Sequence, residues 1–494
     1  MLEESDRFDG RPDEQVPVQS RGVTYAQVRV LAAQPNVFAP PREESLVNAA
    51  GEGEARVAYG VGDMELPLAI GMVRNGGDAT AGPAYIDLDY LLGSLGGHMN
   101  VTGIAGVGTK SSFLTIVLRQ LLRACEERAK ANPADPAKLQ VRPIILNVKG
   151  FDLFWLDQWS TNFTEDDLRA WKEIGWIDPS PFRAKFFAPQ RPGSPNLAIP
   201  VGSRSDVHPY SWSLEDVLIR DLFTYLFSDS DRQDDNFALL VADIERLLVD
   251  ERRGNDGIPE RKLRAGSAIT TFEELFDWFQ DGLDGNGDAA FMTLASVHHA
   301  GTVRRFYRRL RRVVYESSGI FRMYAGESHP LDITGGGTDV GLPLVIDING
   351  LADRHLQRFV VAALMKQAID AQTGANAQAG MHYVFVLDEL NRFAPRGHTD
   401  PITQLIETVA AELRSRGVIL LGAQQQASLV SPRVVENAAV RVVGRTGGHE
   451  LQADVFSFLP EELRQYVEQL ASADKVVHQP SFREPMQVRV PRPP

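Results

Sequence analysis

The sequence predicts an α/β fold, with a mainly parallel sheet, a β-rich segment before it and a helical insertion within it. Short apolar runs within 141–150, 341–350 and 381–395 end in polar residues, which is typical of buried parallel strands. Residues 23–90 differ, because Gly, Pro and Asn cut them into short alternating runs, as in small β-rich domains. Residues 155–330 carry repeated helix-capping pairs, which indicate helices inserted between two sheet strands.

A strand, loop and helix pattern lies at residues 98–122, HMNVTGIAGVGTKSSFLTIVLRQLL. Glycines let backbone N–H groups turn inward, and a helix N-terminus adds partial positive charge, so the pattern is typical of a phosphate cradle. In such a cradle Lys110 reaches the β and γ phosphates, and Ser111 offers its hydroxyl to Mg²⁺. The residues expected around the phosphates are Gly103, Gly106, Gly108, Thr109, Lys110, Ser111 and Ser112.

The loop departs from the usual phosphate-binding pattern at one position. That pattern has glycine directly before the lysine, whereas this chain has Thr109 before Lys110. Either one residue is inserted, or the glycines are displaced by one relative to the lysine. A plain strand-to-helix turn is the alternative interpretation, so the rest of the chain has to decide between the two.

Two adjacent carboxylates, Asp388 and Glu389, follow the apolar run from Val384 to Leu387. Beside a bound nucleoside triphosphate, Asp388 would order the Mg²⁺ shell next to Ser111, and Glu389 would polarise the attacking water. Paired acids at a strand end can also be ordinary helix-capping residues. A lysine-bearing glycine loop in the same chain favours the catalytic interpretation.

The apolar run 417–423 ends in three glutamines, of which Gln425 or a neighbour is suited to sensing the γ-phosphate or holding its water. A strand-end turn is the alternative. Arg414 and Arg416 lie just before this run. Arg414 is the better candidate for an arginine that reaches a neighbouring subunit's nucleotide, and a surface salt bridge is the alternative.

Bulk properties exclude several classes of protein. A chain of 494 residues predicts two or three domains, and a net charge of −14 argues against a surface that coats DNA generally, although a basic pore remains compatible with it. Cys125 is the only cysteine, which excludes a disulfide framework within the chain and fits a reducing cytoplasm. The acidic N-terminus does not resemble a secretory signal, and the apolar runs are too short for a membrane span. We therefore expect a cytoplasmic protein that binds no membrane.

One stretch of the insertion, residues 303–316 (VRRFYRRLRRVVYE), predicts a helix with a broad basic stripe opposite an apolar face. A basic helix in an acidic protein is compatible with contact to nucleic acid. A solvated face or a contact between subunits is the commoner explanation. The arginines of the stripe are Arg304, Arg305, Arg308, Arg309, Arg311 and Arg312.

With these residues in view, the chain resembles the HerA-type branch of the HerA/FtsK superfamily of hexameric translocases. The resemblance covers roughly residues 23–477. It depends on the order of several motifs, each weak alone: the β-rich segment, the HxNxxGxxGxGTKS stretch from His98, NVKGFD, the helical insertion, VIDINGL, VLDELNRFAP and LRSRGVILLGAQQ. Thr109 before Lys110 departs from the motif at a position that bears on the phosphate geometry and the hydrolysis rate.

The resemblance implies a RecA-like P-loop NTPase core and a homo-hexameric ring. It also implies ATP and Mg²⁺ between subunits, double-stranded DNA in the central channel, and a nuclease or other effector as partner. By position, Lys110 and Ser111 are the P-loop residues, Asp388 and Glu389 the acidic pair, Gln425 the sensor and Arg414 the trans-acting arginine. The domains it implies are a flexible N-terminus (1–22), a HAS-barrel-like β-rich domain (23–90), the ATPase core (91–154 and 331–478), a helical insertion (155–330) and a C-terminal tail (479–494).

A second hypothesis is a nucleotide-dependent scaffold or regulator of a partner effector, for instance in an anti-phage defence complex. The overall acidity and the altered loop favour it over a solitary motor. A secretion-type ATPase of the same superfamily is less favoured, because neither a membrane segment nor a membrane-binding basic patch is evident.

Overall fold

The computed structural model divides the chain into two compact units, Met1–Asn48 and Ala49–Pro494. The expected flexible N-terminus, residues 1–22, lies outside the described residues. The structure describes residues 30–33, 45–46, 48–76, 79–104, 110–131, 139–150, 152–176, 179–199, 202, 204–227, 234–253, 259–317, 319–335, 341–373, 377 and 379–494.

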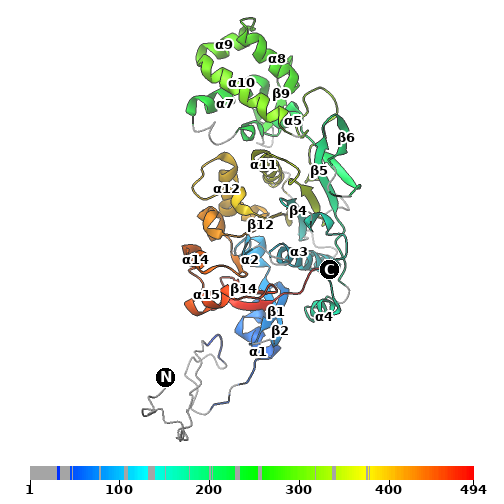
Figure 1. Cartoon of the computed structure of the whole chain (residues 1–494), viewed down its shortest axis with the longest axis vertical. Coiled ribbons are helices and arrows are strands. Elements are labelled where there is room, and N and C mark those ends of the chain that lie inside the picture. The colour runs from blue at the N-terminus through cyan, green and yellow to red at the C-terminus, as the bar shows by residue number, and fades with distance from the viewer. Residues whose placement is uncertain are drawn as a thin grey trace, which may run out of the picture. The chain divides into compact units, whose positions relative to one another are not determined.

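Among the described residues, thirteen strands form one sheet with a parallel centre. Several central strands are buried along their whole length, as expected for a parallel sheet with both faces covered (Figure 1). This confirms the predicted α/β class. In sheet order the parallel strands are β13 (Val440–Val443), β3 (Met99–Thr102), β12 (Val418–Gln424), β11 (Met381–Leu387), β4 (Gln140–Asn147), β10 (Leu344–Asp347) and β5 (Lys185–Arg191).

Both edges of the sheet are extended by further strands. Beyond β13 lie the antiparallel strands β14 (Asp474–His478), β15 (Met486–Arg489), β1 (Pro67–Arg74) and β2 (Thr80–Asp87). Beyond β10, strand β5 pairs with β6 (Ser194–Ala198) in antiparallel and β7 (Val207–Tyr210) in parallel orientation.

These edge strands change two expectations about domains. The described strands of the range 23–90, β1 and β2, extend the main sheet through β15 instead of closing into a barrel of their own. The range 479–494, expected to be a tail, supplies β15. The reason is that Met486 and Val488 alternate with polar residues and are completely buried against the neighbouring strands.

The two faces of the sheet carry separate cores. In β4, Ile144 and Leu146 belong to one core, whereas Val141 and Ile145 belong to the other, because side chains alternate along a strand. Helix α3 (Ser111–Ala131) packs on the second core, together with the short α2 (Asp89–Leu92). The first core includes α11 (Arg354–Ala371), α12 (Pro401–Glu412), α13 (Pro432–Glu436), α14 (Gly448–Leu451) and α15 (Glu461–Glu468).

The insertion at residues 155–330 is mixed. Besides its helices, it contributes β5, β6 and β7 to the sheet. The three predicted capping boxes are confirmed at the starts of α4 (Glu165–Glu173), α5 (Leu214–Ile219) and α8 (Phe272–Leu283). The other described elements are α1 (Glu52–Ala58), before β1, and α7 (Asp235–Leu248), β8 (Val249–Arg253), β9 (Pro259–Leu263), α9 (Ala289–Val297) and α10 (Ala300–Tyr315) of the insertion.

Aromatic side chains hold the helices of the insertion together. The Phe306 ring of α10 lies 5.2 Å from the rings of Phe227 and Phe279 and 5.9 Å from that of Phe237, measured between centroids. Figure 1 shows the resulting group of helices α7 to α10. Within the described part of the chain, no helix is both long and apolar enough to cross a bilayer.

Candidate functional site

Three neighbouring parallel strands bring the candidate residues to one edge of the sheet. Strand β12 pairs with β3 on one side and with β11 on the other, so their carboxyl ends point the same way. The glycine loop follows β3, the acidic pair follows β11 and the glutamines end β12. Adjacent strands lie about 4.8 Å apart, so the loop and the acids begin about 10 Å from each other.

Lys110 occupies the start of α3, where it is buried and 5% exposed. Its Nζ donates to the backbone oxygen of Gly103 at 3.0 Å. Burial lowers the pKa of Lys110, and the nearby Asp388 carboxylate partly opposes this effect. A desolvated ammonium with few fixed partners is suited to pairing with an incoming anion. Three of the predicted loop residues, Gly106, Gly108 and Thr109, lie outside the described residues.

Ser111 and Asp388 come together as predicted. Ser111 Oγ lies 3.4 Å from Asp388 Oδ2, and Asp388 Oδ1 accepts a hydrogen bond from the backbone N–H of Glu389 at 2.9 Å. A hydroxyl and a carboxylate oxygen side by side are hard donors of the kind that Mg²⁺ prefers. No group of three or more His, Cys, Asp and Glu side chains could hold a metal ion among the described residues. The donor set therefore fits Mg²⁺ that takes its remaining ligands from phosphate and water.

Glu389 has an unusual backbone conformation, with φ at 56° and ψ at 47°. Left-handed backbone costs a non-glycine residue of the order of 1–2 kcal/mol and is frequent at functional sites. In a regular strand, the side chains of Asp388 and Glu389 would point to opposite faces of the sheet. The left-handed backbone of Glu389 interrupts this alternation directly after β11. Both carboxylates consequently face the same lysine.

That lysine is Lys149, which follows β4, the strand on the far side of β11. Its Nζ forms an ion pair with Glu389 Oε1 and lies 3.8 Å from Asp388 Oδ2. Burial alone would raise the pKa of Glu389, but hydrogen bonds from Lys149 and Gln425 outweigh it and hold the pKa below its ordinary value. Glu389 is therefore an ionised carboxylate at neutral pH.

Two of the three glutamines at the end of β12, Gln424 and Gln425, have different contacts. Gln425 Nε2 donates to Glu389 Oε1 at 3.0 Å, which places Gln425 in the site as predicted. Gln424 is completely buried and instead bonds across the sheet, with its Nε2 2.7 Å from both Asn100 Oδ1 and Thr102 Oγ1. Gln424 therefore fixes β12 against β3, while Gln425 contacts the acid.

No family model matches the sequence, and no curated protein matches it either. Among solved structures, the unbound bacterial conjugative coupling protein TrwBdeltaN70 superposes with a TM-score of 0.50 at 11% identity, covering 92% of this chain and 96% of that one. The chain has a TrwB-like fold. VirB4 of Thermoanaerobacter pseudethanolicus gives a TM-score of 0.46 at 13% identity, covering 90% and 98%. The plasmid coupling protein TrwB in complex with GDPNP gives 0.48 at 11% identity, covering 82% and 87%.

Within this TrwB-like fold, one predicted residue lies away from the others. Arg414 belongs to a short 3-10 helix, Arg414–Arg416, that precedes β12, whereas Gln425 follows β12. Seven strand residues rise about 23 Å, so Arg414 lies at the opposite edge of the sheet from Lys110 and Glu389. Arg414 is exposed and does not contact the site of its own chain.

Lys149 belongs to the site, although the sequence identifies it only as one of the polar residues that follow the apolar run within 141–150. The available signal was a lysine two residues after a buried strand. The sequence could not show that β4 lies directly beside β11, which is what brings Lys149 to the acids. Asn147, at the end of β4, is instead completely buried and donates to Asp347 Oδ1 at 2.7 Å, so it links β4 to β10.

Proposed function

We propose that this chain is a P-loop NTPase that uses ATP and Mg²⁺ to drive a ring-shaped motor on double-stranded DNA. The observation that supports it most strongly is the arrangement of Lys110, Ser111, Asp388, Glu389 and Gln425 at the ends of three adjacent strands. The residues form one polar cluster, which contains the groups that phosphoryl transfer to water requires: a cation for the phosphates, ligands for the metal and a carboxylate for the water. The single cysteine, Cys125, is compatible with a cytoplasmic location.

Each residue has a distinct role in the proposed reaction. Lys110 neutralises charge on the β and γ phosphates, and Ser111 and Asp388 hold the metal. Mg²⁺ would supply further charge neutralisation on the phosphate oxygens. Glu389 aligns and polarises the attacking water, because it is ionised and lies within hydrogen-bonding distance of Gln425. Gln425 orients Glu389 or the water itself.

Lys149 gives the acid pair a second state. Its ammonium neutralises Glu389 and Asp388 in the structure described here. Because its side chain is 41% exposed, it can turn toward solvent or toward a phosphate, and a metal held by Ser111 and Asp388 would then supply the positive charge beside the acids. The proposal therefore includes an exchange of partners by Lys149 during each cycle.

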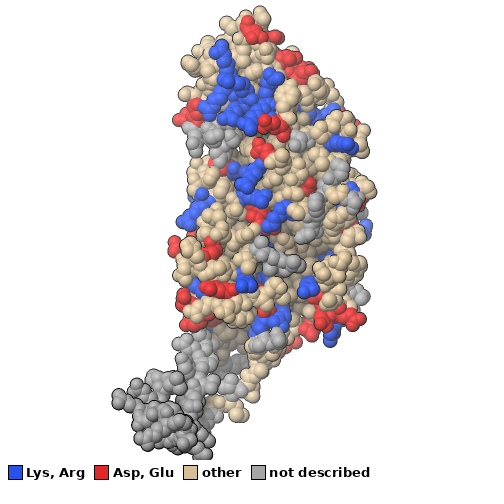
Figure 2. All heavy atoms as spheres, in the orientation of Figure 1, with Lys and Arg blue, Asp and Glu red and all other residues tan. Residues whose placement is uncertain are grey.

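DNA contact is supported by the surface of α10. Phe306, Leu310 and Val314 are buried, as predicted, whereas Val313 is half-buried, and the exposed arginines lie on the opposite face. Arg304, Arg308 and Arg311 recur at helical spacing, and none of these three forms an ion pair with a described carboxylate. Basic side chains gather in Figure 2 over the group of helices α7 to α10, to which this helix belongs. Such a row is suited to contacting backbone phosphates.

Assembly and partners complete the proposal. A homo-hexamer of the HerA type would place Arg414 at the nucleotide of an adjacent subunit, because this arginine is exposed at the edge away from its own site. The effector partner would be a nuclease or another protein that the ring positions on DNA.

The decisive experiment measures ATP hydrolysis with and without duplex DNA. We expect duplex DNA to stimulate hydrolysis, and Glu389→Gln to lower it by about 10²- to 10⁴-fold while ATP is still bound. A triple variant of Arg304, Arg308 and Arg311 to Gln should lose the stimulation and keep the basal rate. A basal rate that survives Glu389→Gln would contradict the assignment of the site.

A second candidate is a ring that scaffolds a partner effector, for instance in anti-phage defence, with nucleotide serving mainly for assembly. The net charge of −14 favours this candidate over a freely DNA-binding motor, and so does Thr109 before Lys110. A slow hydrolysis rate that is indifferent to DNA, together with nucleotide-dependent assembly, would select it.

A further inference from the structure

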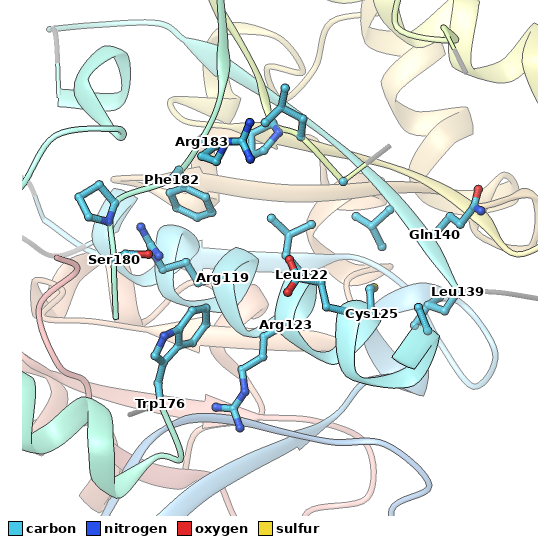
Figure 3. A pocket seen from close by; sticks show the side chains of 17 residues that line it. Arg119, Leu122, Arg123, Cys125, Leu139, Gln140, Trp176, Ser180, Phe182 and Arg183 are labelled. Atoms are coloured by element: carbon cyan, nitrogen blue, oxygen red, sulfur yellow. The ribbon is translucent and has the colours of Figure 1, made fainter. Parts of the chain in front are cut away.

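A cavity of about 600 Å³ lies away from the acid pair. It is lined by α3 from Arg119 to Ala129, by residues 139–141 at the start of β4, and by Trp176 and residues 180–183 and 341–343 (Figure 3). Helix α3 begins at the carboxyl edge of the sheet, and β4 begins at the opposite edge, so the cavity lies at the edge far from Lys110. From Lys110 to Arg119 the helix rises about 13 Å.

The cavity contains a buried guanidinium, that of Arg119, to which no described residue provides a counter-ion. Arg119 is 4% exposed, and its guanidinium carbon lies 4.0 Å from the centre of the Phe182 ring and 5.8 Å from that of Trp176. Its Nε is buried without a hydrogen-bond partner, and no carboxylate of the described residues pairs with it. Burial lowers the pKa of Arg119 to about 10. Contact with aromatic rings offsets only part of the cost of burying such a charge.

Two further arginines line the same cavity. Arg183 is exposed and forms no ion pair with a described residue. Arg123 is half-buried, pairs with Glu127 at 2.7 Å and lies 5.6 Å from the centre of the Trp176 ring. Glu126 is the single carboxylate among the described lining residues, so the lining carries a net positive charge.

We propose that this cavity binds a small planar anion, an aromatic ring that carries a phosphate or carboxylate group. The Arg119 guanidinium would pair with the anionic group, since guanidinium groups bind such oxygens in bidentate fashion. Trp176 and Phe182 would pack against the ring. A volume of about 600 Å³ is within the range of small-molecule sites. The proposal does not depend on the proposed function, because it uses none of the residues around Lys110.

Cys125 provides a reporter in the unmodified chain. It lines the cavity and is the only cysteine, so a neutral aromatic disulfide reports on this position alone. Burial raises the pKa of the Cys125 thiol to about 12, so the reaction is slow enough to follow. At a probe concentration ten times its Kd, a bound probe should slow the reaction about tenfold.

Four probes separate the parts of the ligand. AMP carries a ring and a phosphate, indole-3-carboxylate a ring and a carboxylate, adenosine a ring alone and inorganic phosphate an anion alone. We expect protection of Cys125 by AMP or by indole-3-carboxylate, and whichever protects at lower concentration identifies the anionic group. Equal protection by adenosine or by inorganic phosphate would overturn the proposal, as would protection by none of the four.

Variants test whether protection arises in this cavity. Arg119→Gln should weaken binding of the protecting probe by about 10- to 100-fold, because the variant loses a hydrogen bond between two charged groups. Arg183→Gln alters an exposed side chain, so it preserves the fold and should weaken binding by a smaller factor. Lys110→Ala, in the other site, should leave protection unchanged. Loss of protection in Lys110→Ala, with protection retained in Arg119→Gln and Arg183→Gln, would place the probe at the glycine loop and refute the proposal.

Discussion

Lys149 Nζ forms an ion pair with Glu389 Oε1, although 240 residues separate them in the sequence. The contact exists because β4 and β11 are adjacent and parallel, so that residues following both strands emerge at one edge. The pair couples the protonation state of the proposed base to a lysine that belongs neither to the glycine loop nor to the acidic pair. The pH dependence of hydrolysis therefore tests whether this ion pair acts on the proposed base.

Replacing Lys149 should shift the pH dependence of hydrolysis. Lys149 holds the pKa of Glu389 below its ordinary value, and Glu389 acts as a base only when it is ionised. Removing the ammonium raises that pKa, so Lys149→Met should move the acidic limb of the kcat/KM profile to higher pH. Lys149→Arg, which keeps the charge, is the control. An unchanged acidic limb in Lys149→Met would show that Lys149 does not tune the base.

Gln425 should affect hydrolysis more than its neighbour. Gln425 donates to Glu389, whereas Gln426 is exposed and forms no side-chain bond to the acid pair. Gln425→Ala should lower kcat by about tenfold with little change in ATP binding, because one hydrogen bond to a charged group is lost. Gln426→Ala is the matched control and should behave like the original chain. Equal effects of the two substitutions would refute the assignment of Gln425.

The part of the site that the sequence predicted best depends on local patterns. Lys110 follows a glycine loop and opens a helix, and Asp388 and Glu389 follow a buried strand, so their neighbours along the chain identify them. Lys149 and the division of roles between Gln424 and Gln425 depend on which strands are adjacent. Strand order is a property of the folded sheet, and no local pattern contains it.

The same distinction applies to the fold. The parallel centre was predictable because its strands are continuous apolar runs. The sequence instead predicts that β1 belongs to a separate barrel and β15 to a tail, because Gly, Pro and Asn cut residues 23–90 into short runs and residues 479–494 are rich in proline. In their pairing, Met72 lies opposite Arg489 and Val73 opposite Val488. The two strands come from opposite ends of the second unit, so no local sequence pattern predicts that they pair.

His98 should make the fold sensitive to acid. It is 1% exposed, and its Nδ1 accepts a hydrogen bond from the Leu420 backbone at 3.0 Å, so it fixes the start of β3 against β12. Burial, together with the nearby Arg414, lowers the pKa of His98 from 6.5 to about 4. The neutral form is therefore the native one, and its contribution is present above pH 6.5 and lost as the pH falls toward 4.

The loss from this group amounts to about 3 kcal/mol of unfolding free energy. Denaturant unfolding at pH 7 and pH 4 measures this loss in the original chain and in the variant His98→Asn. Asparagine tolerates the left-handed backbone at this position, and its side chain does not titrate. The variant should lose less stability between the two pH values than the original chain. Identical pH dependence would show that His98 is not the titrating group.

Arg414 should act between subunits. Arg414→Ala is expected to lower hydrolysis by about 10³-fold or more if the arginine completes an adjacent site. Mixing it in equal amounts with Glu389→Gln should restore about a quarter of the original activity, because one interface in four then combines an intact acid with an intact arginine. Arg416→Ala, in the same short helix, is the control. Two inactive variants that stay inactive when mixed would contradict a trans-acting role.

We propose that the glycine loop and the acidic pair act on one triphosphate and its metal. The most direct measurement is a double-mutant cycle of Ser111→Ala and Asp388→Asn on ATP affinity, with and without Mg²⁺. Because Ser111 Oγ and Asp388 Oδ2 lie 3.4 Å apart, we predict that either substitution removes most of the gain in affinity from Mg²⁺ and that the second adds little. Fully additive losses, or equal affinity with and without Mg²⁺ in the original chain, would contradict the account.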